Sequence, residues 1–142
     1  MTELALRVAA AATLIWLGMV LAISFMEAPL KFRAEGLELH VGLAIGRIVF
    51  SALNSVEIVL AVVIAVCLIL GRLSGPLVAL GVVTVVLLGV QLGLVRPRLN
   101  RRTAVVLAGH DAPRSRAHHA YIALETVKLA ALIALGTALL AV

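Results

Sequence analysis

The chain has 142 residues, of which 63% are hydrophobic and 13% are charged, and its mean hydropathy is +1.19. Soluble domains are about 45–50% apolar. A soluble domain of this size could not bury the additional apolar surface, so a soluble enzyme is excluded. Disordered and disulfide-stapled chains are excluded as well. The net charge of +5 would favour nucleic acid in a soluble chain, but here the arginines flank apolar segments, so we expect anionic lipid as the partner and no nucleic acid.

Four apolar segments are long enough to cross a bilayer, which takes about 20 residues in a helix. The first is expected at about residues 8–30 and should remain in the mature protein, because Lys31 and Arg33 follow it rather than precede it. The others are expected at about 42–71, 77–95 and 117–142, with a turn at Gly75-Pro76 and a basic loop over 96–116. No segment alternates with a period of two, so the sequence predicts an all-α integral membrane four-helix bundle, a single domain over residues 1–142.

Basic residues are distributed unequally between the two sides of this bundle. The side opposite the basic loop holds only Arg7 and Arg72. The other side holds eight in its loops: Lys31, Arg33, Arg96, Arg98, Arg101, Arg102, Arg114 and Arg116. By the positive-inside rule these loops face the cytoplasm and both termini face outward, as in a multi-pass protein of the bacterial inner (plasma) membrane. The six arginines of the 96–116 loop are expected at anionic lipid headgroups.

Polar residues inside the apolar segments are the candidates for function, because an ionisable group in lipid is costly unless it is paired or hydrated. They recur at three- and four-residue steps, so each helix has one polar stripe, and the stripes should face one another. Most lie in the cytoplasmic half, which predicts a pocket open to that side. Its expected lining is Glu27, Arg47, Asn54, Glu57, Gln91, Tyr121, Glu125 and Lys128. Glu57 and Lys128 reach a similar depth, so we expect them to pair or to share a partner.

The sequence predicts no catalytic residue, no cofactor and no metal site. His118 and His119 are the metal candidates, but neighbouring side chains splay apart on a helix, and a bundle metal site would need Glu-x-x-His pairs on two helices. Two pairs of glycines, Gly42 with Gly46 and Gly89 with Gly93, match the small-xxx-small packing pattern. Packing within the chain is the preferred interpretation, and a homo-oligomer through these glycines stays open.

Three stretches carry a resemblance to a known family. They are Ile15-Trp16-Leu17-Gly18, the segment from Glu27 through Pro29 to Phe32, and the glycine-rich segment from Gly42 to Phe50. The chain resembles small bacterial four-helix membrane proteins of the transmembrane protein 205-like (DUF4149-type) group in these motifs, in the basic Arg96-Pro97-Arg98 stretch and in a last helix that begins with histidine. The resemblance implies the four-helix membrane fold and no particular activity.

Three classes of function fit these features. The first is small-solute, ion or proton-linked transport, with Glu57 and Glu125 as groups that bind protons or cations. The second is a membrane-embedded enzyme or redox protein acting on a lipid or quinone, and the third is a structural or assembly subunit whose charges only hold the helices in register. Because no nucleophile–base pair and no complete metal set is present, the sequence favours transport over the enzyme.

Overall fold

The computed structural model describes residues 2–111 and 116–142, and four long helical rods account for most of them. The first rod runs through α1 (Thr2–Val20), η1 (Leu21–Glu27) and α2 (Ala28–Lys31), and the second is α3 (Leu39–Leu70). The third runs through α4 (Gly75–Val90), η2 (Gln91–Val95) and α5 (Arg96–Leu107), and the fourth is α6 (Arg116–Leu140). All four rods are long and apolar enough to cross a membrane, which confirms the predicted all-α class with four such helices.

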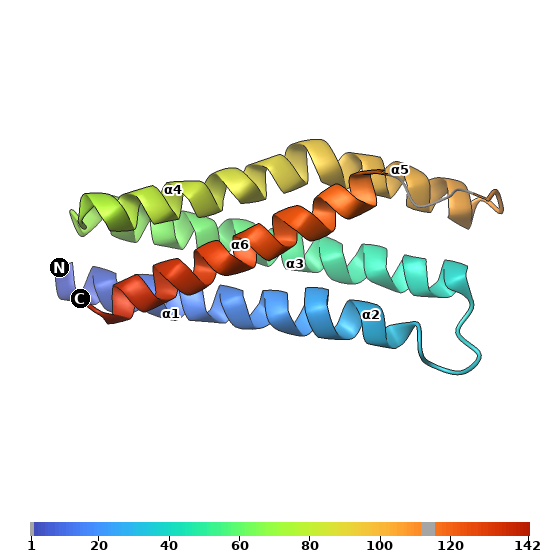
Figure 1. Ribbon diagram of the computed structural model, residues 1–142, viewed down its shortest axis with the longest axis horizontal. Coiled ribbons are helices and arrows are strands. Elements are labelled where there is room, and N and C mark those ends of the chain that lie inside the picture. Colours follow the sequence, from blue (N-terminus) through green and yellow to red (C-terminus); the bar gives the residue numbers. More distant parts are fainter. Residues whose placement is uncertain (1, 112–115) are drawn as a thin grey trace.

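The rods run up and down in sequence order, because short connections leave consecutive helices antiparallel. Both termini lie at one end together with the turn 71–74, and we call this the terminal end (Figure 1). The opposite end holds the loop 32–38 and α5, and we call it the basic end. In Figure 1, α6 crosses the bundle obliquely, from a place beside α5 at the basic end to a place beside α1 at the terminal end.

The third rod corrects the predicted helix boundary at Val95. The basic stretch expected to be a loop over 96–116 is helical as far as Leu107, so this rod is 33 residues long. The loop was expected because the apolar segment ends at Val95 and six arginines follow it within residues 96–116. A proline inside a helix lacks the N–H donor and its ring collides with the carbonyl four residues earlier, so helices usually end before it.

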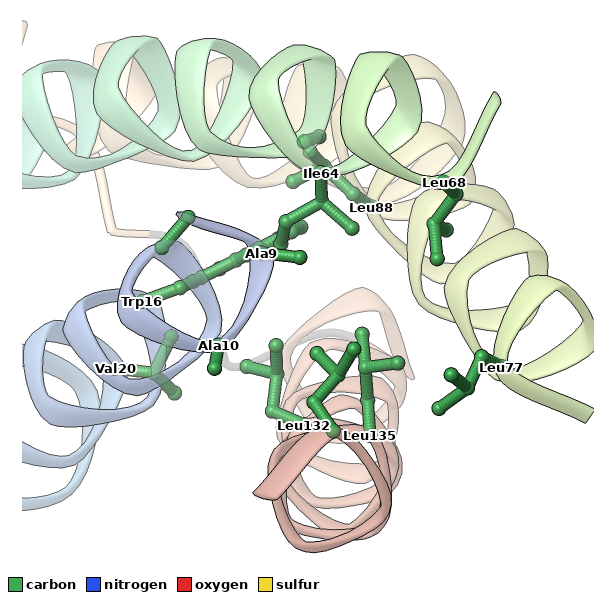
Figure 2. Close-up of a cluster of buried hydrophobic side chains, with 13 residues drawn as sticks. Ala9, Ala10, Trp16, Val20, Ile64, Leu68, Leu77, Leu88, Leu132 and Leu135 are labelled. Carbon is green, nitrogen blue, oxygen red and sulfur yellow. The ribbon is translucent and has the colours of Figure 1, made fainter. Parts of the chain in front are cut away.

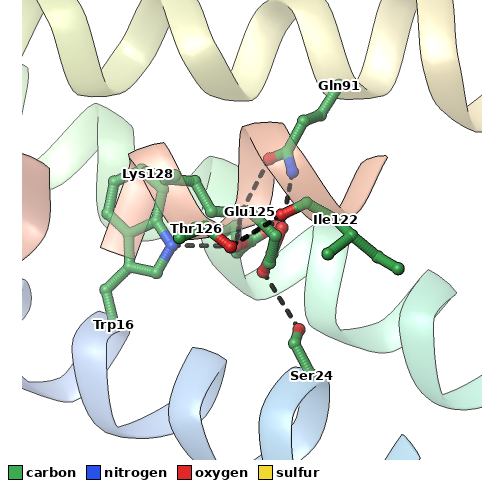
Figure 3. Close-up of polar contacts among 8 residues, drawn as sticks. Trp16, Ser24, Gln91, Ile122, Glu125, Thr126 and Lys128 are labelled. Atoms are coloured by element: carbon green, nitrogen blue, oxygen red, sulfur yellow. Dashed lines mark hydrogen bonds and ion pairs between the residues drawn. The ribbon is translucent and has the colours of Figure 1, made fainter. Parts of the chain in front are cut away.

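Two π-helical segments explain how the first and third rods continue through their prolines. The segment η1 lies just before Pro29 and η2 lies just before Pro97, and in both cases the following residue donates a backbone hydrogen bond five residues back. The wider turn relocates the carbonyl that the proline ring would otherwise meet. Each extra residue also rotates the face that the helix presents. The π segments carry Ser24 and Gln91, which both point toward α6 (Figure 3).

The terminal half of the bundle is filled by apolar side chains from all four rods. Figure 2 shows this core with Trp16, Ile64, Leu77 and Leu132 converging between the rods. Trp16, Leu132 and Leu135 have no exposed surface. Alanines on α1 let the rods approach closely in this half. The half of the protein near the termini is therefore a packed apolar core.

A close approach of α1 to the end of α3 explains why residue 71 is glycine. A Cβ atom placed on Gly71 would lie 2.6 Å from the carbonyl oxygen of Cys67 and 2.7 Å from the Cβ of Ala5. Neither atom can rotate away. We therefore expect Gly71→Ala to lower the free energy of unfolding by about 1–3 kcal/mol, the usual cost of overpacking.

Gly89 is the matched control for this substitution, because a Cβ there meets nothing within 4 Å. Gly89→Ala should be neutral or stabilising, since alanine favours a helix by up to about 1 kcal/mol. Unfolding of both variants by SDS in mixed micelles measures the difference. Equal stability of the two variants would show that the packing at Gly71 is looser than described.

Candidate functional site

A buried polar cluster lies in the middle of the bundle, at the basic-end border of the apolar core. Each of the four rods contributes at least one side chain to it: Trp16, Ser24, Glu57, Gln91, Glu125 and Lys128. Glu57, Gln91, Glu125 and Lys128 are at most 2% exposed. The predicted convergence of the polar stripes is therefore observed at this level of the bundle.

Lys128 is the centre of this polar cluster. Its Nζ atom lies 2.5 Å from Glu57 Oε1, 2.8 Å from Gln91 Oε1 and 3.2 Å from Glu125 Oε2. The ammonium donates hydrogen bonds to Glu57 and Gln91 and forms an ion pair with Glu125. The expected pairing of Glu57 with Lys128 is confirmed as a direct ion pair, and Glu125 shares the same ammonium.

The two carboxylates take further hydrogen bonds from neutral donors. Trp16 Nε1 donates to Glu57 Oε1 at 2.9 Å, and Ser24 Oγ donates to Glu125 Oε1 at 3.0 Å. Gln91 Nε2 donates to Glu125 Oε2 at 2.5 Å while its Oε1 accepts from Lys128, so the amide bridges the anion and the cation (Figure 3). With both carboxylates ionised, two negative charges face one positive charge, and the cluster carries one uncompensated negative charge.

Two of these partners were not among the predicted pocket residues. Trp16 and Ser24 lie on the polar face of the first helix, and their spacing from one another follows the same stripe. Neither side chain is ionisable. The free-energy cost of burying a charge, which pointed to the ionisable residues, therefore did not point to Trp16 or Ser24. The signal that identifies them is their common face with Glu27 and Lys31, at three- and four-residue steps along the first rod.

A cavity of about 500 Å³ opens between the four rods at the basic end. Glu125 and Ser24 belong to its lining as well as to the polar cluster, so the cavity and the cluster are continuous. The rings of Phe50 and Tyr121 pack edge to face in its wall, with centroids 5.9 Å apart. Small-molecule sites in proteins usually occupy about 300–1,000 Å³ and have mostly apolar walls with a few polar groups. This cavity has that character.

Basic side chains surround the cavity. Arg96 lies over the two aromatic rings, with its guanidinium carbon 4.7 Å from the Phe50 centroid and 5.5 Å from the Tyr121 centroid. Such stacking holds a guanidinium plane by cation–π attraction. The basic members of the lining are Lys31, Arg47, Arg96, Arg102 and His118, and the acidic member within the described residues is Glu125.

The other predicted pocket residues lie outside the buried polar cluster. Arg47 is exposed and lines the cavity, and Tyr121 is buried in its wall. Asn54 is half-buried and lies outside the cavity lining. Glu27 also lies outside it and contacts Lys31 one turn later on its own helix, at 3.6 Å. The predicted set thus divides into a buried cluster, a cavity wall and two residues that belong to neither.

The arginines expected at lipid headgroups fall into two groups, those that line the cavity and those that are exposed. Arg96 and Arg102 line the cavity and are half-buried. Arg98, Arg101 and Arg116 are exposed, as a headgroup contact requires. Arg114 lies outside the described residues. The continuation of the third rod places Arg96 beside Tyr121 of α6, and the headgroup contact of these arginines stays a prediction.

The two histidines considered as metal ligands lie in different environments. His118 lines the cavity and His119 is exposed, and no group of three potential metal ligands occurs within residues 2–111 and 116–142.

A Cβ on Gly42 would collide with the ring of Phe32, and one on Gly46 would lie 2.9 Å from Lys31 Nζ. This glycine pair therefore packs within the chain. Gly89 and Gly93 face open space, so a homo-oligomer through them stays a prediction.

Comparisons of the chain with protein families, with curated proteins and with solved structures give no match. The resemblance to the transmembrane protein 205-like group therefore stays a prediction.

Proposed function

We propose that this protein is a small-solute transporter of the bacterial inner membrane, in which the solute enters the cavity from the basic end and its movement is linked to a proton on Glu125. The observation that carries the proposal is the double position of Glu125, which lines the cavity and also contacts Lys128 and Gln91 in the buried polar cluster. A solute in the cavity would thus act directly on the balance of buried charge.

The charge balance of the cluster supports a proton site. Glu57 and Glu125 share one ammonium, and an unpaired buried carboxylate is costly in a medium of low dielectric constant. Binding one proton removes that cost. Because Glu125 borders the cavity and Glu57 does not, Glu125 is the carboxylate that can exchange a proton with it.

The apolar core supports transport by alternating access rather than an open channel. In this conformation the cavity opens at the basic end, while the terminal half is filled by the packed core. Release on the other side would need a second conformation that separates the rods there. The π segments η1 and η2 lie at the level of the polar cluster and are the places where the first and third rods could bend.

The distribution of charge supports a cytoplasmic basic end with both termini outside. The third rod, at about 1.5 Å per residue, would be about 50 Å long, whereas the hydrocarbon layer is about 30 Å thick. Its arginine-rich part α5 would then project into the headgroup region. The cavity mouth would lie at the level of the cytoplasmic headgroups.

Proton movement by the purified protein in liposomes tests the proposed function. We expect a membrane potential to drive acidification of a trapped pH dye faster than in protein-free liposomes, and Glu125→Gln to abolish the difference. The glutamine keeps the size and can still bond Ser24 and Gln91, but it cannot exchange a proton.

Glu38→Gln is the matched control, because Glu38 is an exposed carboxylate at the same end and is absent from the cavity lining. This variant should conduct as the unmodified protein does. If the folded wild-type protein moves no protons, or if Glu125→Gln moves them unchanged, proton-linked transport through Glu125 is wrong. The structural alternative would then be favoured, since the hydrogen bonds of the polar cluster already stabilise the bundle.

A further inference from the structure

We propose that the cavity binds an anionic amphiphile, a molecule with one carboxylate or phosphate head and an apolar chain. The inference rests on the proposed function, because it names the class of solute for the same cavity. It is argued from the charge of the lining, the state of Arg96 and the apolar character of the walls.

The charge of the lining selects an anion. Five basic side chains surround the cavity, and its carboxylate, Glu125, already contacts Lys128. A cationic solute would meet more basic than acidic side chains in this lining. An anion would be attracted from the headgroup region and held by charge-assisted hydrogen bonds.

Arg96 is the residue best placed to hold the head. Its guanidinium plane is oriented by stacking on Phe50 and Tyr121, which are neutral rings. Within residues 2–111 and 116–142, no carboxylate forms an ion pair with Arg96 or with Arg47. Arginine presents paired N–H donors that match the oxygens of a carboxylate or phosphate. The cavity therefore holds a guanidinium group that stacks on two neutral rings and forms no direct ion pair within the described residues.

The rest of the cavity lining favours a ligand with an apolar chain over a small inorganic anion. The apolar lining includes Phe25, Phe32, Leu39, Leu43, Leu99 and Ile122. Neutral polar side chains are few, namely Ser24, Asn100, Thr103 and Tyr121, and Ser24 already donates to Glu125. A sugar or another strongly hydrated solute would lose its hydrogen bonds with water and find few replacements. An acyl chain would find an apolar surface.

Binding of radiolabelled laurate to the purified protein, immobilised in a neutral detergent, tests the inference. We expect saturable binding that is displaced by dodecyl phosphate and not by the neutral dodecanol or the cationic dodecylamine. Arg96→Gln should weaken binding about tenfold, the scale of one lost charge-assisted hydrogen bond. Arg96→Lys should weaken it less, because the charge remains and only the planar donor pair is lost.

Arg33→Gln is the matched control, since Arg33 is exposed at the same end of the bundle and does not line the cavity. It should bind laurate as the unmodified protein does. Ala28→Phe provides a second test that keeps every charge: it introduces a large side chain at a lining position and should abolish binding by filling the cavity. The melting temperature of each variant shows that it is folded.

Phosphatidylglycerol as competitor distinguishes the two sources of this chemistry. Displacement of laurate by phosphatidylglycerol supports the inference and assigns the ligand to a membrane lipid. Failure to displace it supports the inference with a free single-chain amphiphile as ligand. Equal competition by dodecanol, or unchanged binding by Arg96→Gln, would overturn it. Laurate binding that depends on Arg96 without proton flux would refute only the proposed function, and flux without laurate binding would refute only this inference.

Discussion

Replacing Lys128 by methionine should destabilise the protein far more than replacing either carboxylate that it contacts. The Lys128 ammonium compensates both Glu57 and Glu125, and the three side chains are essentially inaccessible to solvent. Lys128→Met leaves two buried carboxylates facing each other without a counter-ion. The loss should be about 3–5 kcal/mol, the range for removing one side of a buried ion pair.

Glu57→Gln should cost much less, about 1 kcal/mol, because Glu125 still neutralises Lys128 and the new amide can accept from Trp16 and Lys128. The double variant Glu57→Gln/Lys128→Met should recover a large part of the loss, since the remaining Glu125 keeps its donors Ser24 and Gln91. A large loss of stability for Lys128→Met beside a small loss for Glu57→Gln is the result expected when one cation is shared between two anions.

The free energy of unfolding in mixed micelles with SDS measures these differences. Lys31→Met is the matched control: Lys31 faces Glu27 at 3.6 Å in a partly exposed pair, and its loss should cost less than about 1 kcal/mol. Equal losses from Lys128→Met and Glu57→Gln would mean that Glu125 does not share the charge of the ammonium. Simple addition in the double variant would mean that each charge is solvated independently.

The polar cluster could be predicted from the sequence largely because the physics of lipid leaves few alternatives. Glu57, Gln91, Glu125 and Lys128 are polar residues that apolar segments cannot expose, and helical periodicity places them on inward faces. Their approximate depth along each helix follows from the rise per residue. Direct pairing of Glu57 with Lys128 follows from equal depth and opposite charge.

The sequence predicts a pocket at the basic end, but most of the residues that line it could not be predicted in the same way. The lining depends on how the rods cross, and α6 runs obliquely, beside α5 at one end and beside α1 at the other (Figure 1). A crossing angle is set by the packing of many side chains and leaves no local pattern. The position of Arg96 in the cavity lining depends on the π segment η2, through which the third rod continues, whereas the arginines that follow Val95 predicted a loop.

The orientation of the bundle should produce an all-or-none labelling pattern. In a Cys67→Ala background, Ser74→Cys should react with a membrane-impermeant maleimide added to intact cells, whereas His110→Cys should react only after lysis. Both positions are exposed, and they lie at opposite ends of the bundle. The physical reason is the imbalance of basic residues, which resist translocation when they flank membrane helices.

The structure sharpens this prediction by placing the basic groups at one end. Lys31, Arg33 and the arginines of α5 lie there together, whereas Arg7 and Arg72 lie at the terminal end. Labelling of His110→Cys but not Ser74→Cys in intact cells would reverse the orientation. It would also move the cavity mouth to the outer face, so a solute would reach Glu125 from outside the cell. The labelling result therefore decides which compartment fills the cavity, and with it the direction in which a proton on Glu125 could be exchanged.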